Sequence, residues 1–290
     1  MRILITGASG FIGSYFMKFF GDRGYEVVGV IRNKENINRE YRYIIGDLAD
    51  GLNTSENFDV IIHCAAELDK YPKNIEKYII GNINATQNIL NYAKKWDIKK
   101  IINLNSVRCF GRIQEDTLSE LSPIVDPGYY GMTKTIAERL LLDSDIPTIS
   151  LILPGIIGKD GHTPWLMRVS RDLLQNNSID CYQPDAMFNN VMHIQTLAEN
   201  VKKLLEVKIE KNENILLGCR NLMSKYDVLC LLKKGLLSKS LIRIINSEDI
   251  SFYLNIDKAK KMNLFLPTVE AELGKLIEEL REDAKSRECR

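Results

Sequence analysis

The sequence is poor in the features that would place it in a specialised class of protein. Its six cysteines form no C-x-x-C pair and show no cysteine/histidine spacing suited to a zinc site. The longest apolar run, over 146–158, is interrupted by Pro147 and Pro154, so a membrane span is not expected. The 39 basic and 38 acidic residues leave a net charge of +1, and such a chain has no overall field to attract nucleic acid. We therefore expect no metal, no nucleic-acid partner and no membrane partner.

The composition is that of an ordinary globular protein. Apolar residues make up 45% and charged residues 27% of 290 residues, which is enough chain for a core that needs no disulfide. The first glycine, Gly7, comes too early for the apolar region of a signal peptide. We therefore expect a cytoplasmic protein with reduced cysteines.

Short β-branched runs alternate with longer segments of helical period, which is typical of βαβ units. Runs such as 149–153 are apolar throughout, as in strands that helices cover on both faces. We predict an α/β fold with a Rossmann-type, doubly wound parallel sheet. The predicted strands are 2–6, 26–31, 43–45, 60–64, 100–105, 148–153 and 214–217, and the predicted helices are 12–23, 83–96, 130–143, 165–174, 196–205 and a charged, solvated helix over 274–290.

A glycine-rich loop follows the first predicted strand and opens the first helix. It reads Thr6-Gly7-Ala8-Ser9-Gly10-Phe11-Ile12-Gly13, with glycines spaced G-x-x-G-x-x-G. A turn that brings backbone N–H groups against a pyrophosphate has no room for Cβ atoms, and the helix N-terminus favours the anion. The alternative is a tight turn without a ligand. We predict a dinucleotide site with contacts from Gly7, Ser9, Gly10, Phe11, Ile12 and Gly13.

The end of the second predicted strand bears on the choice of dinucleotide. NAD-binding folds place an acid there for the ribose hydroxyls, but this chain reads Ile31-Arg32-Asn33. Arg32 can pair with a 2′-phosphate and so favours NADP over NAD, although it can also be an exposed cation at a strand end. Asp47, after the third strand, is a candidate for the adenine amine or a turn-forming residue.

Three polar residues form a candidate catalytic set. Tyr130 and Lys134 stand four residues apart on one face of a predicted helix. A phenol with a pKa of about 10 is a poor acid or base at neutral pH, and a nearby cation favours its ionised form. Ser106 closes the fifth strand, where parallel sheets place ligand contacts, and can donate to the oxygen that Tyr130 protonates. This set fits hydride transfer to or from a carbon that bears oxygen.

The chain resembles the extended short-chain dehydrogenases/reductases of the NAD(P)-dependent nucleotide-sugar epimerase, dehydratase and reductase family. The resemblance implies that Ser106 polarises the carbonyl, Tyr130 is the acid/base, and Lys134 binds the nicotinamide ribose and lowers the pKa of Tyr130. It covers most of the chain and rests, in order, on the motifs at 6–13, 46–48, 63–66, 84–88, 106–111, 130–134 and 191–194.

The resemblance also implies further contacts and an architecture. Residues 1–155 would form the NADP-binding domain and 156–290 mainly a small substrate-binding lobe, with a segment near 191–222 returning to the sheet. A nucleotide sugar would be the substrate, and helices 83–96 and 130–143 would pair into the four-helix bundle of a homodimer. The further cofactor contacts implied are Leu48, Cys64, Ala65, Ala66, Asn84, which would also support the active site, and Pro154.

Departures from the family pattern narrow the predicted reaction. This chain has Val107-Arg108 where 4,6-dehydratases carry Asp-Glu, which argues against a dehydratase. Arg32 replaces the acid of many NAD-retaining epimerases. We expect NADPH-dependent reduction of a nucleotide-activated 4-keto-6-deoxy sugar. The alternatives are an NAD-dependent nucleotide-sugar C4 epimerase and a non-catalytic dinucleotide-binding regulator, against which the intact catalytic set argues.

The later part of the chain supplies fewer candidates. Asn189-Asn190 and Gln195-Thr196 replace the Arg-Asp and Asp-Asp of the family, so Arg168 or Arg171 is the candidate for the substrate diphosphate unless both are solvated. His162 is a candidate substrate contact and second acid/base.

Two histidines and one cysteine are assigned to packing. His63 and His193 are interpreted as structural hydrogen-bonding groups. Cys109 lies close to Ser106 in the sequence and is interpreted as a packed thiol.

Overall fold

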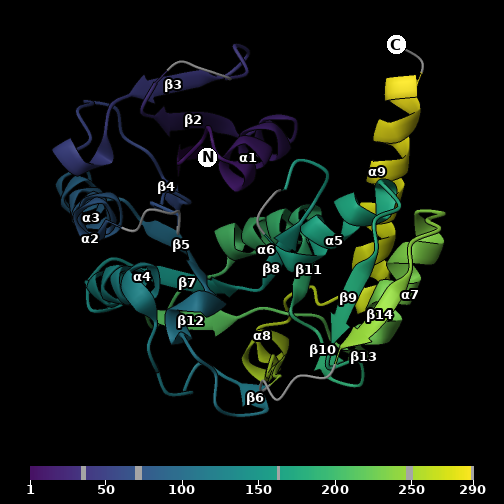
Figure 1. Ribbon diagram of the computed structural model, residues 1–290. Coiled ribbons are helices and arrows are strands. Elements are labelled where there is room, and N and C mark those ends of the chain that lie inside the picture. The colour runs from purple at the N-terminus through teal and green to yellow at the C-terminus, as the bar shows by residue number, and fades with distance from the viewer. Residues whose placement is uncertain (34–36, 69–73, 162–163, 246–250, 289–290) are drawn as a thin grey trace. The chain divides into compact units, whose positions relative to one another are not determined.

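A computed structural model describes residues 1–33, 37–68, 74–161, 164–245 and 251–288 (Figure 1). The chain forms two compact units. Unit 1 comprises Met1–Arg112, Pro123–Ile152 and Val201–Ile215, and unit 2 comprises Ile113–Ser122, Leu153–Asn200 and Leu216–Arg290. Among the described residues, none of the helices carries an apolar stretch that could traverse a lipid bilayer.

Unit 1 is built on a seven-stranded sheet in the order β12-β7-β5-β4-β1-β2-β3. Successive residues of the central strand β1 are fully buried, as the exposed fractions of 0% for Ile3, Leu4 and Ile5 show. Burial on both faces confirms the predicted doubly wound sheet, in which β1–β2, β1–β4, β2–β3 and β4–β5 pair in parallel. The strands are β1 (Arg2–Thr6), β2 (Glu26–Ile31), β3 (Arg42–Ile45), β4 (Val60–His63), β5 (Lys100–Ser106), β7 (Thr148–Leu153) and β12 (Glu213–Leu216).

Helices cover this sheet because their apolar stripes match its buried strand residues. In one core cluster, Leu4 and Ile101 of the sheet lie with Ile89 of α3 and Leu141 of α4. The helices are α1 (Phe11–Gly21), η1 (Leu48–Asp50), α2 (Ile75–Tyr78), the π-helical η2 (Ile79–Asn84), α3 (Ala85–Lys95), η3 (Val107–Phe110) and α4 (Gly128–Leu142), while α6 (Ile194–Glu206) runs from unit 2 into unit 1.

Unit 2 combines helices with four two-stranded sheets: β8–β11, β9–β14 and β6–β15 are parallel and β10–β13 is antiparallel. Its core cluster brings together Leu166 of α5, Leu229 of α7 and Leu273 of α9. The elements are β6 (Thr117–Leu118), β8 (Gly155–Ile157), α5 (Trp165–Leu174), β9 (Ile179–Tyr182), β10 (Met187–Phe188), β11 (Val191–His193), β13 (Met223–Ser224), α7 (Lys225–Gly235), β14 (Ile242–Ile245), β15 (Tyr253–Leu254), α8 (Asp257–Lys261) and α9 (Val269–Glu288).

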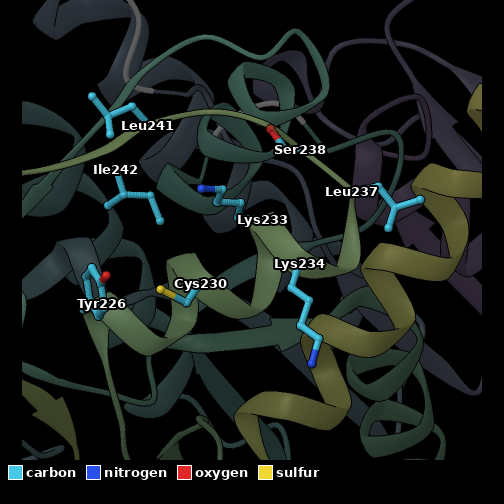
Figure 2. A pocket seen from close by; sticks show the side chains of 8 residues that line it. All are labelled: Tyr226, Cys230, Lys233, Lys234, Leu237, Ser238, Leu241 and Ile242. Carbon is cyan, nitrogen blue, oxygen red and sulfur yellow. The ribbon is translucent and has the colours of Figure 1, made fainter.

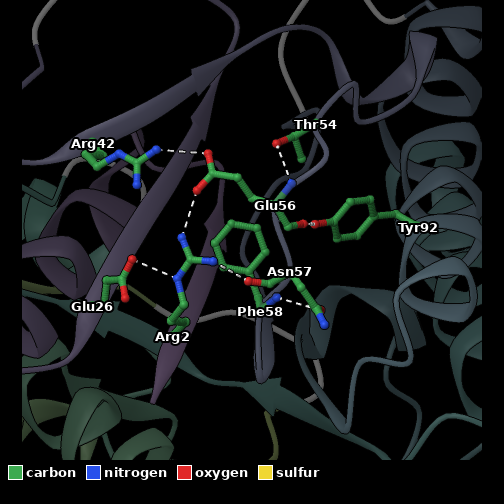
Figure 3. Close-up of polar contacts among 8 residues, drawn as sticks. All are labelled: Arg2, Glu26, Arg42, Thr54, Glu56, Asn57, Phe58 and Tyr92. Carbon is green, nitrogen blue, oxygen red and sulfur yellow. Dashed lines mark hydrogen bonds and ion pairs between the residues drawn. The ribbon is translucent and has the colours of Figure 1, made fainter.

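A polar cluster joins the beginnings of β1 and β2 to the segment before β4 (Figure 3). Arg2 Nε lies 2.7 Å from Glu26 Oε1, and Arg2 Nη2 lies 2.7 Å from Glu56 Oε2. The third nitrogen of Arg2, Nη1, donates to Asn57 O at 2.6 Å, and Arg42 pairs with the other oxygen of Glu56 at 2.9 Å. One guanidinium therefore fixes three segments at the end of the sheet opposite the glycine loop.

Candidate active site

The glycine loop after β1 leaves no room for side chains. Gly7 has a φ of +64°, and a Cβ on it would lie 2.8 Å from the Ala65 Cα. A Cβ on Gly13 would lie 2.2 Å from the Gly7 carbonyl oxygen. Gly10 caps α1, whose first N–H groups have no side-chain cap. A close backbone turn that leads into a helix N-terminus fits the pyrophosphate of a dinucleotide.

The remaining predicted contacts of the loop lie at its surface. Ser9 is exposed, and Phe11 and Ile12 at the start of α1 are half-buried. Thr6 Oγ1 accepts a hydrogen bond from the Ala65 N–H at 3.1 Å, so the loop is tied to the end of β4. The half-buried stretch Cys64, Ala65 and Ala66 therefore lies beside the glycine loop, where the dinucleotide groove is predicted.

His63 has a structural position. Its ring nitrogens lie 2.8 Å from Thr6 Oγ1 and 3.0 Å from Thr86 Oγ1, and the residue is 1% exposed. Burial lowers the pKa of His63 to about 3, so the ring is neutral. The structure therefore confirms its interpretation as a hydrogen-bonding group between the loop and α3.

Arg32 follows β2 and faces a carboxylate. Its Nη1 lies 3.7 Å from Glu67 Oε2, and the Glu67 N–H donates to Asn82 Oδ1 at 2.8 Å. The Arg32 side chain is 70% exposed, which leaves it able to move toward a ligand. Asp47 Oδ1 accepts from the Ala49 N–H at 2.9 Å, as a turn-forming residue does, and its predicted adenine contact stays a prediction.

The predicted catalytic residues lie on β5 and α4 of unit 1. Ser106 ends β5, and its Oγ accepts from the Arg108 N–H at 3.2 Å, so the hydroxyl keeps its own proton to donate. Lys134 is 4% exposed, and its Nζ donates to Leu104 O at 2.8 Å. Tyr130 lies one helical turn before Lys134, and the Arg108 Cζ is 5.8 Å from the centre of its ring. The end of β5 and helix α4 thus bring Ser106, Tyr130 and Lys134 to one part of unit 1.

Burial shifts the protonation equilibrium of Lys134. The apolar surroundings lower its pKa to about 8, and the carboxylate of Glu138 opposes this shift. Lys134 is therefore still mostly protonated at neutral pH. Tyr130 forms part of the wall of a cavity of about 210 Å³, whose lining is Arg108, Gly111, Asp126, Pro127, Gly128, Tyr129 and Tyr130.

Asn82, which the sequence analysis did not single out, supports α4. Asn84, at the end of η2, is exposed, and its predicted contact with the cofactor and the site stays a prediction. Asn82 is buried instead, and its Nδ2 donates to Thr133 Oγ1 of α4 at 3.0 Å. The π-helical turn changes which residues of this segment face inward. A polar residue within the apolar run Ile79-Ile80-Gly81-Asn82-Ile83 is the only sequence signal for this role.

Leu48 and Cys109 are buried and contact other parts of unit 1. Leu48 begins η1 and is buried, and its carbonyl accepts from Asn88 Nδ2 at 2.9 Å. Cys109 is 3% exposed, and burial raises its pKa to about 12, which confirms a packed thiol. The predicted cofactor contact of Leu48 is not among these bonds and stays a prediction.

The predicted site residues of unit 2 differ in their exposure. Arg168 and Arg171 are exposed on α5, and Pro154 is buried between β7 and β8. His162 lies outside the described residues. His193 is 1% exposed, with its Nε2 3.3 Å from Glu279 Oε2, which agrees with a structural role.

A second cavity, of about 480 Å³, lies along α7 in unit 2 (Figure 2). It combines apolar side chains with two lysines and a cysteine, and none of the predicted site residues that the structure describes lines it. The lining is Tyr226, Cys230, Lys233, Lys234, Leu237, Ser238, Leu241 and Ile242.

Comparison with known proteins agrees with the fold. Low-salt glycan biosynthesis protein Agl12 of Haloferax volcanii is 26% identical over an alignment of 169 residues, and the match covers 51% of this chain and 54% of the relative. UDP-glucose 4-epimerase of Halalkalibacterium halodurans is 25% identical over an alignment of 154 residues, and the match covers 48% of this chain and 45% of the relative. The chain thus spans about half the length of these curated relatives.

A solved structure matches along nearly the whole chain. It is the Bordetella bronchiseptica enzyme WbmG in complex with NAD and UDP, with a TM-score of 0.84 and 18% identity over 98% of this chain and 96% of that chain. At this identity the match shows the fold alone. Residues 3–218, which include β1 to β12, match the model of one family. The chain therefore belongs to the NAD dependent epimerase/dehydratase family.

Proposed function

We propose that this protein reduces a nucleotide-activated 4-keto-6-deoxy sugar with NADPH. The observation that carries the proposal is the buried Lys134, whose Nζ is held by Leu104 O at 2.8 Å, one turn after Tyr130 on α4. A phenol, an ammonium and the hydroxyl of Ser106 at the end of β5 are the groups that carbonyl reduction needs. When bound, the dinucleotide supplies the hydride.

The chain's own residues hold the oxygen and move the proton. Ser106 donates a hydrogen bond to the keto oxygen and so favours the negative charge that develops there. Tyr130 gives its phenolic proton to the same oxygen. Lys134 is mostly protonated at neutral pH, because its pKa is about 8, and its charge favours the resulting phenolate. Its hydrogen bond to Leu104 O keeps that charge in place.

The proposed choice of NADPH rests on Arg32. Because its guanidinium stands at the end of β2 in place of an acid, it is suited to a 2′-phosphate. In solution, Arg32→Asp is expected to shift the preference from NADPH to NADH, measured as the ratio of the two dissociation constants. An unchanged ratio would remove Arg32 from cofactor selection.

The second candidate is an NAD-dependent C4 epimerase acting on a nucleotide sugar. One relative bears the name UDP-glucose 4-epimerase, and the matched solved structure holds NAD and UDP. In addition, Glu67 lies 3.7 Å from Arg32 and its negative charge opposes a 2′-phosphate. Mass and absorbance of the dinucleotide that copurifies separate the candidates, because an epimerase retains NAD and a reductase exchanges NADPH.

The reaction is tested by NADPH oxidation against a panel of 4-keto-6-deoxy nucleotide sugars. Tyr130→Phe is expected to bind NADPH like the wild type. Its turnover is expected to fall by a factor of roughly a thousand or more, because a positioned acid/base group contributes a rate enhancement of that order. Tyr25→Phe, which removes a hydroxyl from a tyrosine before β2, serves as the matched control. A fully active Tyr130→Phe variant would exclude the proposed acid.

We also propose a cytoplasmic homodimer that pairs two copies of α4 and the α2–η2–α3 segment. Support comes from apolar side chains exposed on these helices, with exposed fractions of 47% for Ile80, 48% for Met132 and 41% for Ile136. Sedimentation of the wild type is expected to give a dimer. Met132→Glu is expected to give a larger monomer fraction, and an unchanged dimer would exclude this face.

A further inference from the structure

A buried carboxylate lies next to Lys134. Glu138 follows Lys134 by one helical turn on α4 and is 8% exposed, while Lys134 is 4% exposed. Side chains four residues apart on a helix are neighbours on the same face. A carboxylate is costly to bury without a partner, so the position of Glu138 calls for an explanation.

Two buried donors orient Glu138. Ser150 Oγ on β7 donates to Glu138 Oε1 at 2.6 Å. Asn103 Nδ2 on β5 in turn donates to Ser150 Oγ at 2.9 Å. Asn103 is 2% and Ser150 0% exposed, so both bonds are shielded from water. Because the single hydroxyl proton of Ser150 points to Glu138, this bond fixes the position of the Glu138 carboxyl group.

Three other titratable groups that interact with Lys134 in the described chain carry no charge at neutral pH. Cys64 and Cys109 are thiols whose pKa burial raises, and His63 is a ring whose pKa burial lowers to about 3. Glu138 favours the protonated form of Lys134 more strongly than either thiol does.

We propose that Glu138 is a positioning residue that keeps Lys134 protonated and thereby supports proton transfer by Tyr130. The Asn103–Ser150–Glu138 chain holds this carboxylate against the sheet. The inference rests on the proposed function only for the roles of Tyr130 and Lys134. Its first test needs no turnover, so a failure of the proposed reaction leaves that test intact.

The test follows the titration of Lys134 by NMR in the full chain with isotope-labelled lysine side chains, with Lys134→Met used to assign the signal. A unit charge one helical turn away, at the effective dielectric constant of such sites, corresponds to roughly one to two pH units. Glu138→Gln is therefore expected to lower the Lys134 midpoint by that amount. Glu138→Asp, which keeps the charge, is expected to restore most of it.

The controls separate charge from structure. Gln can still accept from Ser150, so the fold is expected to persist, which a thermal melt checks. Asp143→Asn, at the exposed C-terminal end of α4, is expected to leave the Lys134 midpoint unchanged. If Glu138→Gln does not fold, Ser150→Ala replaces it and is expected to give a smaller downward shift. An unchanged midpoint in either folded variant would overturn the proposal.

A second readout is the pH dependence of NADPH oxidation. Neutral Lys134 no longer favours the phenolate of Tyr130, so the alkaline loss of turnover is expected to begin at lower pH in Glu138→Gln. If turnover falls equally at every pH while the Lys134 midpoint stays unchanged, Glu138 is merely structural.

Discussion

Gly13→Ala probes the dinucleotide loop at its tightest point. An added Cβ would lie 2.2 Å from the Gly7 carbonyl oxygen, 2.8 Å from the Gly7 carbonyl carbon and 2.9 Å from the Ala8 Cα. All three are backbone atoms, so no flexible side chain can move aside. Ordinary contact begins at 3.4 Å, which means that the turn must open by more than an ångström.

The magnitude follows from three contributions. Overpacking of this kind costs about 1–3 kcal/mol. Displacement of the Gly7 carbonyl weakens its 2.9 Å hydrogen bond with the Gly10 N–H, which is worth about 1 kcal/mol. Alanine in a helix offsets up to about 1 kcal/mol relative to glycine. We expect the free energy of unfolding to fall by about 1–3 kcal/mol and NADPH affinity to fall at least about tenfold.

The assay combines urea denaturation with NADPH binding followed by fluorescence. Gly274→Ala on α9 is the matched control, because an added Cβ there meets nothing within 4 Å. The control is expected to be as stable as the wild type or slightly more stable, with unchanged NADPH affinity. A Gly13→Ala variant with wild-type stability and affinity would refute the close-turn account of this loop.

Two other predictions concern buried lysines. Lys100→Met is expected to lower the free energy of unfolding, measured by urea denaturation, by about 2–4 kcal/mol. The reason is that Lys100 Nζ donates to three carbonyl oxygens at the end of α6, those of Leu204, Leu205 and Val207, at 2.8, 2.7 and 2.6 Å. Wild-type stability of the variant would show that these carbonyls find other partners. For Lys134, burial lowers the pKa from 10.5 to about 8, so the unfolded chain binds more protons between these values and stability is expected to rise with pH there by up to about 3 kcal/mol. The rise is measured as the difference between wild type and Lys134→Met, and a flat difference would contradict the buried charge.

The sheet of unit 1 could be predicted because its strands are apolar throughout and β-branched. The expected strands 2–6, 26–31 and 148–153 coincide with β1, β2 and β7. The glycine loop could also be predicted from the sequence, since the spacing of its glycines reflects a local steric requirement. Boundaries shifted by one residue at the other strands of this sheet, where neighbouring loops decide the ends.

The elements of unit 2 were much harder to predict from the sequence. Its paired strands are two to four residues long and carry no usable period, so only helix α5 matched its prediction in full there. The segment Ile113–Ser122 belongs to unit 2 because β6 pairs with β15, far along the chain. Such pairings depend on tertiary contacts that a local pattern does not encode.

The supporting residues of the site were missed for a related reason. Glu138 reads as a solvated charge on a helix, and its burial depends on Ser150 from β7. Asn82 faces inward because η2 is π-helical. Lys100, at the end of β5 away from the site, was missed as well, because its partners are carbonyls at the end of α6. In each case the partner lies on another element, so only the folded chain shows the contact.

The most direct test of the central claim is the fate of deuterium carried by NADPH at both hydrogen positions of nicotinamide C4. After incubation with a 4-keto-6-deoxy nucleotide sugar, mass spectrometry and NMR locate the label in the product. We predict deuterium on sugar C4 with the wild type and labelling slower by a factor of about a thousand or more with Tyr130→Phe, although the variant still binds NADPH. Deuterium-free product from the wild type, or equal labelling by Tyr130→Phe, would contradict hydride transfer assisted by Tyr130.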